Sequence, residues 1–571
     1  MKTKDIKILA LGLLSLGLAS CGEDWLNTES KTDTTTGNFY KTAEEAEIAL
    51  VGCYDGWQRT VSSGPTFAFY MSSEVMSDEC FGGTGNNDSK NTMVIDRFDI
   101  SQASSEQNLF NDLWTYYYAA IYRCNELITR SENISWSSET SKGTILGQAR
   151  AIRALCYFDL ARLFENVPLI TEPTTENVPQ ASPDSTYALI VSDLKYAAEN
   201  IPASAFPKSS ASSNDGRITC YAAKAMLARV YLFYNGVYGK DPQNLTKAEA
   251  LQGLEDVISS GEFSLIEHFK NLWPAASKTW TQSSDGSWSC DSTYAGKGNA
   301  ETVLAMKFNN TSDYNGNTDG NRFIVMMGVR GGTFKAPYGQ GWGACTVTEK
   351  MVSSFGSGDN RRNASLIDMA SEGIEDMSDY QSAGISDQRE YTGYFIKKYT
   401  PLSKYVRATD GTWSLTHDTD GMSSDGDFQI SQYQDYVLMR YADVLLMAAE
   451  LGSSNAQSYF NQVRQRAYTD DDGTISSYYV QKSATQENIM AERKLEFAFE
   501  GLRYWDLLRQ GADYAAEQIE SAQNNATVLD GGVTTTSSFV KSNLTSKRGF
   551  MQIPQTQIDL SNGVLKQNEG W

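Results

Sequence analysis

Histidine is almost absent from this chain of 571 residues, which contains only His268 and His417. A metal site built from several histidines is therefore excluded, and a histidine-dependent catalytic triad would have to use one of two isolated residues. The sequence also lacks the nucleophile elbow GxSxG, the phosphate-binding loop GxxxxGK(S/T) and the metalloprotease helix HExxH. We therefore predict that the protein is not an enzyme and holds no cofactor and no metal ion.

One group of acidic residues leaves an alternative to that prediction. Asp418, Asp420, Asp425 and Asp427 could bind calcium, but position 12 counted from Asp418 is Gln429 instead of the glutamate of an EF-hand. A calcium loop of another type remains an alternative.

Positive charge is scarce: 48 Lys and Arg stand against 70 Asp and Glu, a net charge of −22. A surface this acidic repels a nucleic-acid backbone and an anionic membrane surface, so neither is an expected partner. Neutral ligands are not affected by this charge.

Long apolar runs are absent after the first twenty residues, so no transmembrane helix is expected in the rest of the chain. The start is different: Lys2, Lys4 and Lys7 precede the apolar stretch 8–19, and Leu18-Ala19-Ser20-Cys21 follows. This order resembles a bacterial lipobox, which implies a signal peptide at 1–20 and lipid attachment at Cys21. A plain signal peptide followed by a chance cysteine is the alternative.

The eight cysteines contain no CxxC pair, which argues against a zinc site or a redox motif. Without Cys21 seven remain, an odd number. Cys124 and Cys156 recur at helical core spacing, and we predict that they are small buried side chains and not disulfide partners.

Apolar residues recur with helical spacing through both ends of the chain. The predicted helices are 106–130, 145–163, 183–200, 221–234, 246–259, one that contains Val437 to Ala448, 455–468 and 485–509. Their short connections and small-residue rows such as Ala222 to Ala228 favour stacked helical hairpins similar to tetratricopeptide repeats. The predicted fold class is mainly α, and a plain helical bundle is the alternative.

The segment from about Trp273 to Gly426 has a different composition. Residues 285–345 contain eleven glycines where the chain average predicts about five. Short runs at 302–308 and 322–329 are typical of strands. We therefore divide the chain into 1–20, a helical part 21–270, a loop-rich aromatic insert 271–430 and a helical part 431–571.

The run from Glu492 to Arg509 interleaves charges with large aromatic side chains. Glutamates spaced four apart on one helix face repel unless cations lie between them. We predict the pairs Glu500–Arg503 and Asp506–Arg509, within a partly buried ion network that fixes the helical scaffold.

Several of these segments together resemble the SusD/RagB family of outer-membrane lipoproteins. The matching segments, in chain order, are Cys21, Gln148 to Phe158 with Asn166-Val167-Pro168-Leu169, Tyr436 to Glu450, Glu492 to Arg509, Ile553-Pro554 and Gln567-Asn568. They cover both ends of the chain, whereas 270–430 carries no matching motif.

The resemblance implies a surface lipoprotein of the outer membrane that binds an oligosaccharide without cleaving it. Such proteins cap a SusC-like TonB-dependent transporter and deliver the glycan to it. A peptide-binding lid, or a mainly structural gate with little affinity of its own, are the alternatives.

Two regions are expected to hold the sugar, because aromatic rings cover its C–H faces and polar side chains bond its hydroxyls. The loop region 77–95 and the aromatic insert supply the candidate residues, although each ring could instead fill local core. The predicted ligand-binding residues are Asp78, Phe81, Asn86, Asn87, Asp88, Trp280, Trp288, Tyr294, Tyr338 and Trp342.

Overall fold

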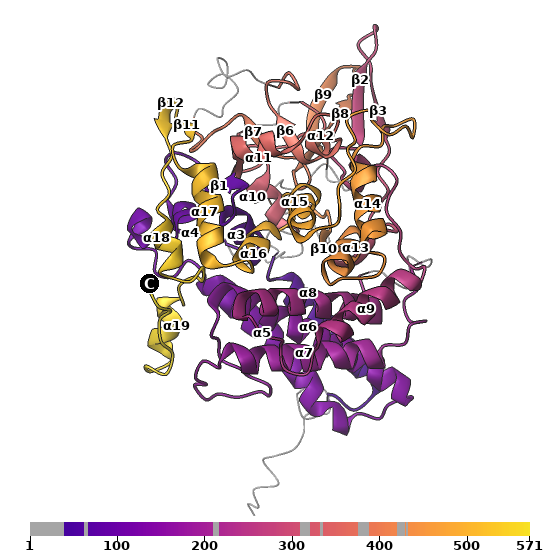
Figure 1. Ribbon diagram of the computed structural model, residues 1–571, viewed down its shortest axis with the longest axis vertical. Coiled ribbons are helices and arrows are strands. Elements are labelled where there is room, and N and C mark those ends of the chain that lie inside the picture. Colours follow the sequence, from indigo (N-terminus) through magenta and orange to yellow (C-terminus); the bar gives the residue numbers. More distant parts are fainter. Residues whose placement is uncertain are drawn as a thin grey trace, which may run out of the picture.

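The computed structural model describes residues 39–61, 67–208, 216–308, 320–331, 335–374, 387–418, 429 and 432–571. Cys21 and the predicted signal peptide lie outside these residues. The molecule is mainly helical with short strands (Figure 1), which confirms the predicted fold class. The four-part division of the chain stays a prediction.

Of the N-terminal helices, α5 to α9 lie together at one end of the molecule, whereas α3 and α4 lie away from this group (Figure 1). The helices of this part are α2 (Ala43–Gln58), α3 (Phe69–Val75), α4 (Asn91–Arg97), α5 (Asn111–Thr129), α6 (Glu139–Phe164), α7 (Pro183–Asn200), α8 (Cys220–Tyr238) and α9 (Lys247–Ser259). Short 3₁₀ turns occupy 100–103, 130–133 and 269–272.

Local signals explain where these helices begin and end. Pro183 occupies the first turn of α7, and the Ser182 hydroxyl accepts from the backbone N–H of Ser185. Thr246 and Glu249 form a capping box at the start of α9. The helix boundaries that the sequence predicted for this part are confirmed to within a few residues.

Most of the C-terminal helices lie above α5 to α9 in Figure 1, and α19 lies at their side. They are α13 (Tyr441–Glu450), α14 (Ala456–Ala467), α15 (Gln486–Glu496), α16 (Arg503–Leu508), α17 (Ala512–Gln523), α18 (Lys541–Thr545) and α19 (Gln555–Leu560). The middle of the chain adds α10 (Arg322–Met327), α11 (Glu349–Ser354) and α12 (Arg361–Ser365).

The strands of the described residues form only two-stranded antiparallel pairs. The pairs are β1 (Cys80–Phe81) with β5 (Thr346–Val347), β2 (Lys278–Gln282) with β3 (Trp288–Ser292), β4 (Thr302–Met306) with β10 (Tyr436–Arg440), β6 (Leu366–Asp368) with β7 (Tyr394–Ile396), β8 (Leu402–Arg407) with β9 (Trp413–Asp418), and β11 (Thr527–Asp530) with β12 (Val533–Thr536). The β2–β3 and β8–β9 hairpins project together from the end opposite α7 (Figure 1).

Three predicted elements are wrong. The segment 322–329 is not a strand: residues 322–327 form helix α10, in which Phe323 to Met327 are all buried and do not alternate with exposed residues. Val437 lies in β10, and the following helix α13 begins only at Tyr441. The predicted helix 485–509 is interrupted after Glu496, and α16 begins at Arg503.

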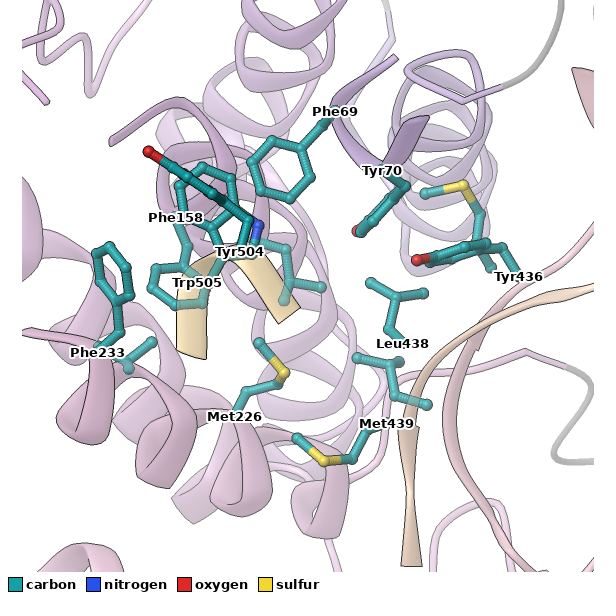
Figure 2. Packing of buried hydrophobic residues seen from close by; sticks show 14 of the residues in the cluster. Phe69, Tyr70, Phe158, Met226, Phe233, Tyr436, Leu438, Met439, Tyr504 and Trp505 are labelled. Carbon is teal, nitrogen blue, oxygen red and sulfur yellow. The ribbon is translucent and has the colours of Figure 1, made fainter. Parts of the chain in front are cut away.

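A continuous apolar core joins segments that lie far apart in the sequence. Trp505 of α16 stacks on Phe69 of α3, with ring centroids 5.2 Å apart and ring planes 4° apart. Figure 2 shows Phe158 and Phe233 beside Trp505, while Tyr70 lies beside Tyr436 of β10. This core holds the loops of the middle segment against the helical scaffold.

Candidate functional site

The connection between β1 and α4 is held in place by buried charged groups from distant parts of the chain. The Asp96 carboxylate accepts from the backbone N–H of Gly82 at 3.1 Å. Arg389 donates to the carbonyl oxygens of Asn86 at 3.0 Å and Asp88 at 2.9 Å. The loop 82–88 therefore has a fixed backbone although its tip is exposed.

The buried carboxyl groups beneath this loop have shifted acidities. Burial, together with the nearby Glu390 carboxyl, raises the pKa of Asp96 to about 7. Burial also raises the pKa of Glu390, although its ion pair with Arg97 opposes this shift. The loop is thus supported by two buried carboxyls whose pKa values are raised, that of Asp96 to about 7.

A cavity of about 720 Å³ opens beside this loop, a volume within the range of ligand-binding clefts. Its walls come from the β1–α4 connection, helix α10 and the loop that follows it, and the segment 340–342. The lining residues are Phe67, Thr84, Asp88, Ser89, Asn91, Thr92, Met326, Arg330, Gly331, Gln340, Gly341, Trp342 and Asp387.

Trp342 supplies the large aromatic surface of this cavity. Its backbone is fixed by a hydrogen bond from the Trp342 N–H to the Val325 carbonyl at 2.8 Å. The preceding Gly341 runs so close to Gly328 that an added Cβ would lie 2.4 Å from its backbone atoms. Glycine is therefore required there for the indole to reach the cavity wall.

Charged groups line the cavity together with Trp342, and the Arg322 guanidinium lies 4.8 Å from the centroid of the indole ring. The Arg330 guanidinium pairs with Asp387 at 2.8 Å and lies 3.4 Å from Asp88, and it donates to the Trp342 carbonyl at 3.3 Å. The carboxylate side chains are about half exposed, 51% for Asp88 and 43% for Asp387. They can therefore accept hydrogen bonds from a polar ligand that enters from solvent.

A second aromatic group lies on the two hairpins. The Trp288 ring stacks on Tyr405 of β8, with centroids 3.8 Å apart and planes 11° apart, and Trp280 meets the same tyrosine edge-on at 5.4 Å. These rings are partly exposed, and much of each ring face is used in packing against its neighbours. Tyr294 is also partly exposed and lies outside the cavity.

Three predicted ligand-binding residues lie in the core and are not retained in the candidate site. Asp78 is fully buried and pairs with Arg503 at 2.6 Å. Burial alone would raise the Asp78 pKa, but Arg503 and Lys494 outweigh it and hold the pKa below its usual range. Phe81 fills the core in β1, and the buried Tyr338 hydroxyl donates to Glu372.

Of the ten predicted residues, the cavity unites Asp88 and Trp342. Asn86 and Asn87 are exposed on the adjoining loop but do not line it. The sequence analysis did not identify Arg330 and Asp387. Arg330 stands in the glycine-rich insert twelve residues before Trp342, which is a weak signal, whereas Asp387 has none in the sequence.

Two features are absent from the described ranges. No helix there combines the length and the apolar character needed to cross a bilayer. No cluster of three or more His, Cys, Asp or Glu there has a geometry that could hold a metal ion. Asp418 pairs with Lys278 at 2.7 Å, and the other three aspartates of the calcium alternative lie outside the described residues.

Comparison with protein families gives two matches that together span most of the chain. Residues 300–571 match a model described as the SusD family. Residues 58–232 match a model described as starch-binding associating with outer membrane.

Individual relatives agree with these family matches. The chain is 25% identical over 534 residues to SusD-like protein P38 of Formosa agariphila, covering 89% of this chain and 92% of that protein. It is 24% identical over 524 residues to a SusD-like protein of Bacteroides ovatus, covering 88% of this chain and 82% of that protein.

Solved structures share the fold. A laminarin binding SusD-like protein superposes with a TM-score of 0.67 at 24% identity, covering 93% of this chain and 100% of that one. Surface glycan-binding protein A from Bacteroides thetaiotaomicron, in complex with laminarihexaose, also superposes with a TM-score of 0.67. The identity is 21%, and the match covers 92% of this chain and 100% of that one.

Proposed function

The chain belongs to the SusD/RagB family, and from this premise we propose that it captures an oligo- or polysaccharide and delivers it to a SusC-like TonB-dependent transporter. In this proposal Cys21 carries the lipid that anchors the protein to the outer surface of the outer membrane. The chain binds its glycan without cleaving it.

The observation that carries the proposal is the indole of Trp342 in an open cavity among charged groups. A sugar ring presents an apolar C–H face and a rim of hydroxyls. Trp342 matches the face, while Asp88 and Asp387 accept from hydroxyls and Arg330 donates to their oxygens. Asn86 and Asn87, and the hairpin residues Trp280, Trp288 and Tyr294, remain proposed outer contacts for a longer chain.

The test is binding to a panel of polysaccharides by affinity gel electrophoresis and calorimetry, beginning with laminarin and starch. We expect saturable binding of at least one neutral glycan. Trp342→Ala should weaken it about tenfold, which corresponds to about 1.4 kcal/mol for the lost stacking surface. The melting temperature of the variant checks that it is folded.

Trp136→Ala is the matched control, since Trp136 is also partly exposed but lies in the connection before α6, outside the cavity lining. Unchanged glycan affinity in Trp342→Ala would remove this cavity as the site. Failure to bind any glycan, combined with tight binding of oligopeptides, would replace the proposal with the peptide-binding lid.

A further inference from the structure

A second cavity, of about 640 Å³, is lined by strand β4 and by a group of cationic side chains. The charged residues of its described lining are Lys208, Arg217, Lys297, Lys307 and Asp435. Four cations thus face one carboxylate in a chain with a net charge of −22. Among the described residues, this cavity shares no lining residue with the one beside Trp342.

Lys208 is the least compensated of these cations. Its ammonium donates to the Thr302 carbonyl at 2.7 Å, and no carboxylate of the described residues lies within 4.0 Å of it. Burial, together with repulsion from Lys307, lowers the pKa of Lys208 to about 8. A negative charge brought into this cavity would be stabilised by Lys208.

The neighbouring cations are held at the cavity wall by the fold. The buried Asp435 carboxylate lies 2.7 Å from the Lys307 ammonium and 3.9 Å from that of Lys297. The Lys297 ammonium also lies 3.5 Å from the centroid of the Tyr433 ring. Arg217, at the approach to α8, pairs with Glu47 of α2.

We propose that this cavity is a second binding site, which takes a carboxylate or sulfate group, either carried by an acidic saccharide or present as a free ion. Ammonium groups on one wall can bond several oxygens of one oxyanion, and such charge-assisted bonds are the strong ones. The volume is that of a small-molecule site. The proposed glycan capture at Trp342 does not depend on this site.

The test is a calorimetric titration of the chain that lacks residues 1–21. The titrants are trigalacturonate, maltotriose, sodium acetate and sodium sulfate. We expect saturable binding of trigalacturonate but not of neutral maltotriose, and weaker binding as the NaCl concentration rises. Lys208→Gln should weaken the anion affinity about tenfold, the effect of losing one charge-assisted contact. Lys240→Gln removes an exposed lysine paired with Asp184 and is the matched control.

Chemical labelling of the parent chain is a second measurement, and it does not require that a variant folds. Lys208 should react with an amine-acylating reagent near pH 8, and bound anion should slow that reaction at Lys208 but not at Lys240. Trigalacturonate binding more tightly than acetate and sulfate would assign the site to a saccharide, and equal affinities would assign it to a free ion. Absence of binding and of protection by every anion would overturn the proposal, as would equal affinities in Lys208→Gln and the parent.

Discussion

The buried ion network around Glu496 shows how single residues fix the scaffold. The Arg440 guanidinium pairs with Glu496 at 2.9 Å, with Glu500 at 2.8 Å and with Glu301 at 2.5 Å, and all four side chains are buried. Burial alone would raise the Glu496 pKa, but Arg466, Arg440 and Arg361 outweigh it and lower the pKa to about 2. Each partner therefore depends on the others to stay charged in the core.

Arg440→Met should lower the free energy of unfolding by about 3–5 kcal/mol, because it removes a buried cation shared by three carboxylates that stay buried. Chemical denaturation with urea measures this loss as a shift of the midpoint. Arg59→Met is the control: Arg59 and Asp55 are each more than a third exposed and 3.6 Å apart, so we expect a loss below about 1 kcal/mol. Equal losses in the two variants would contradict the argument.

The sequence predicted that a buried ion network exists here, but only one of the two predicted ion pairs forms. Asp506–Arg509 is confirmed at 2.9 Å, since both residues belong to one short helical segment. Glu500–Arg503 is wrong, because Arg503 pairs with Asp78 and Glu500 pairs with Lys398 and Arg440. Asp78 precedes Arg503 by 425 positions, and local spacing carries no information about such a partner.

At the scale of elements, the break between α15 and α16 is the main departure from the predicted helices. Phe499 and Gly501 have φ values of +63° and +72°, which end the helical path. The turn places the Gly501 N–H against the buried Glu74 carboxylate. Periodicity continues through this turn because the residues on both sides face the same core, so the sequence pattern resembles one long helix.

Gly501→Ala should destabilise the fold by about 2–5 kcal/mol. A non-glycine residue at this φ costs about 1–2 kcal/mol, and its Cβ would lie 2.6 Å from the Tyr436 hydroxyl oxygen, which adds an overpacking cost of about 1–3 kcal/mol. Thermal and urea unfolding provide the measurement.

Gly286→Ala separates the two costs of that substitution. Gly286 also has a positive φ, +83°, but its Cβ would meet nothing within 4 Å. A loss of about 1–2 kcal/mol is expected there. Similar losses at both glycines would show that the close approach to Tyr436 contributes nothing.

The candidate site was predictable by region and only partly by residue. The loop after β1 and the aromatic insert, the two regions predicted to hold the sugar, both contribute residues to the lining of one cavity, and its role in binding stays a prediction. Asp78 and Phe81 are residue types that also occur in binding loops, yet both are buried. Phe81 is paired in strand β1, and Asp78 forms an ion pair with Arg503. Only tertiary contacts separate such residues from the exposed Asp88.

At the scale of the whole molecule, buried carboxyl groups fall into two sets with opposite pKa shifts. Burial and a neighbouring carboxyl raise the pKa values of Asp96 and Glu79 to about 7. Arginine partners outweigh burial at Asp443 and Glu496 and lower their pKa values to about 2. The two sets make stability depend on pH in opposite directions.

Between about pH 4 and pH 7 the folded chain keeps a proton on Asp96 that the unfolded chain has released, so the free energy of unfolding falls as pH rises. Below about pH 4 the unfolded chain protonates its acids first, while folded Glu496 stays ionised down to about pH 2. Stability therefore falls as pH drops through that window. We expect the melting temperature to be highest near pH 4–5.

Asp96→Asn tests the acidic group beneath the loop 82–88 directly. The variant cannot ionise at this position, so the fall in melting temperature between pH 5 and pH 7 should become shallower than in the parent. Because the chain also gains net negative charge over this range, Glu132→Gln is the control: Glu132 is 82% exposed, and its substitution removes one negative charge without touching a buried carboxyl. A slope that flattens equally in both variants would attribute the effect to overall charge repulsion instead of Asp96.

If Asp96 causes the pH dependence of stability, glycan affinity at the neighbouring cavity should also vary between pH 5 and pH 7 in the parent. This variation should be smaller in Asp96→Asn, because the Asp96 carboxyl accepts the hydrogen bond from the Gly82 N–H.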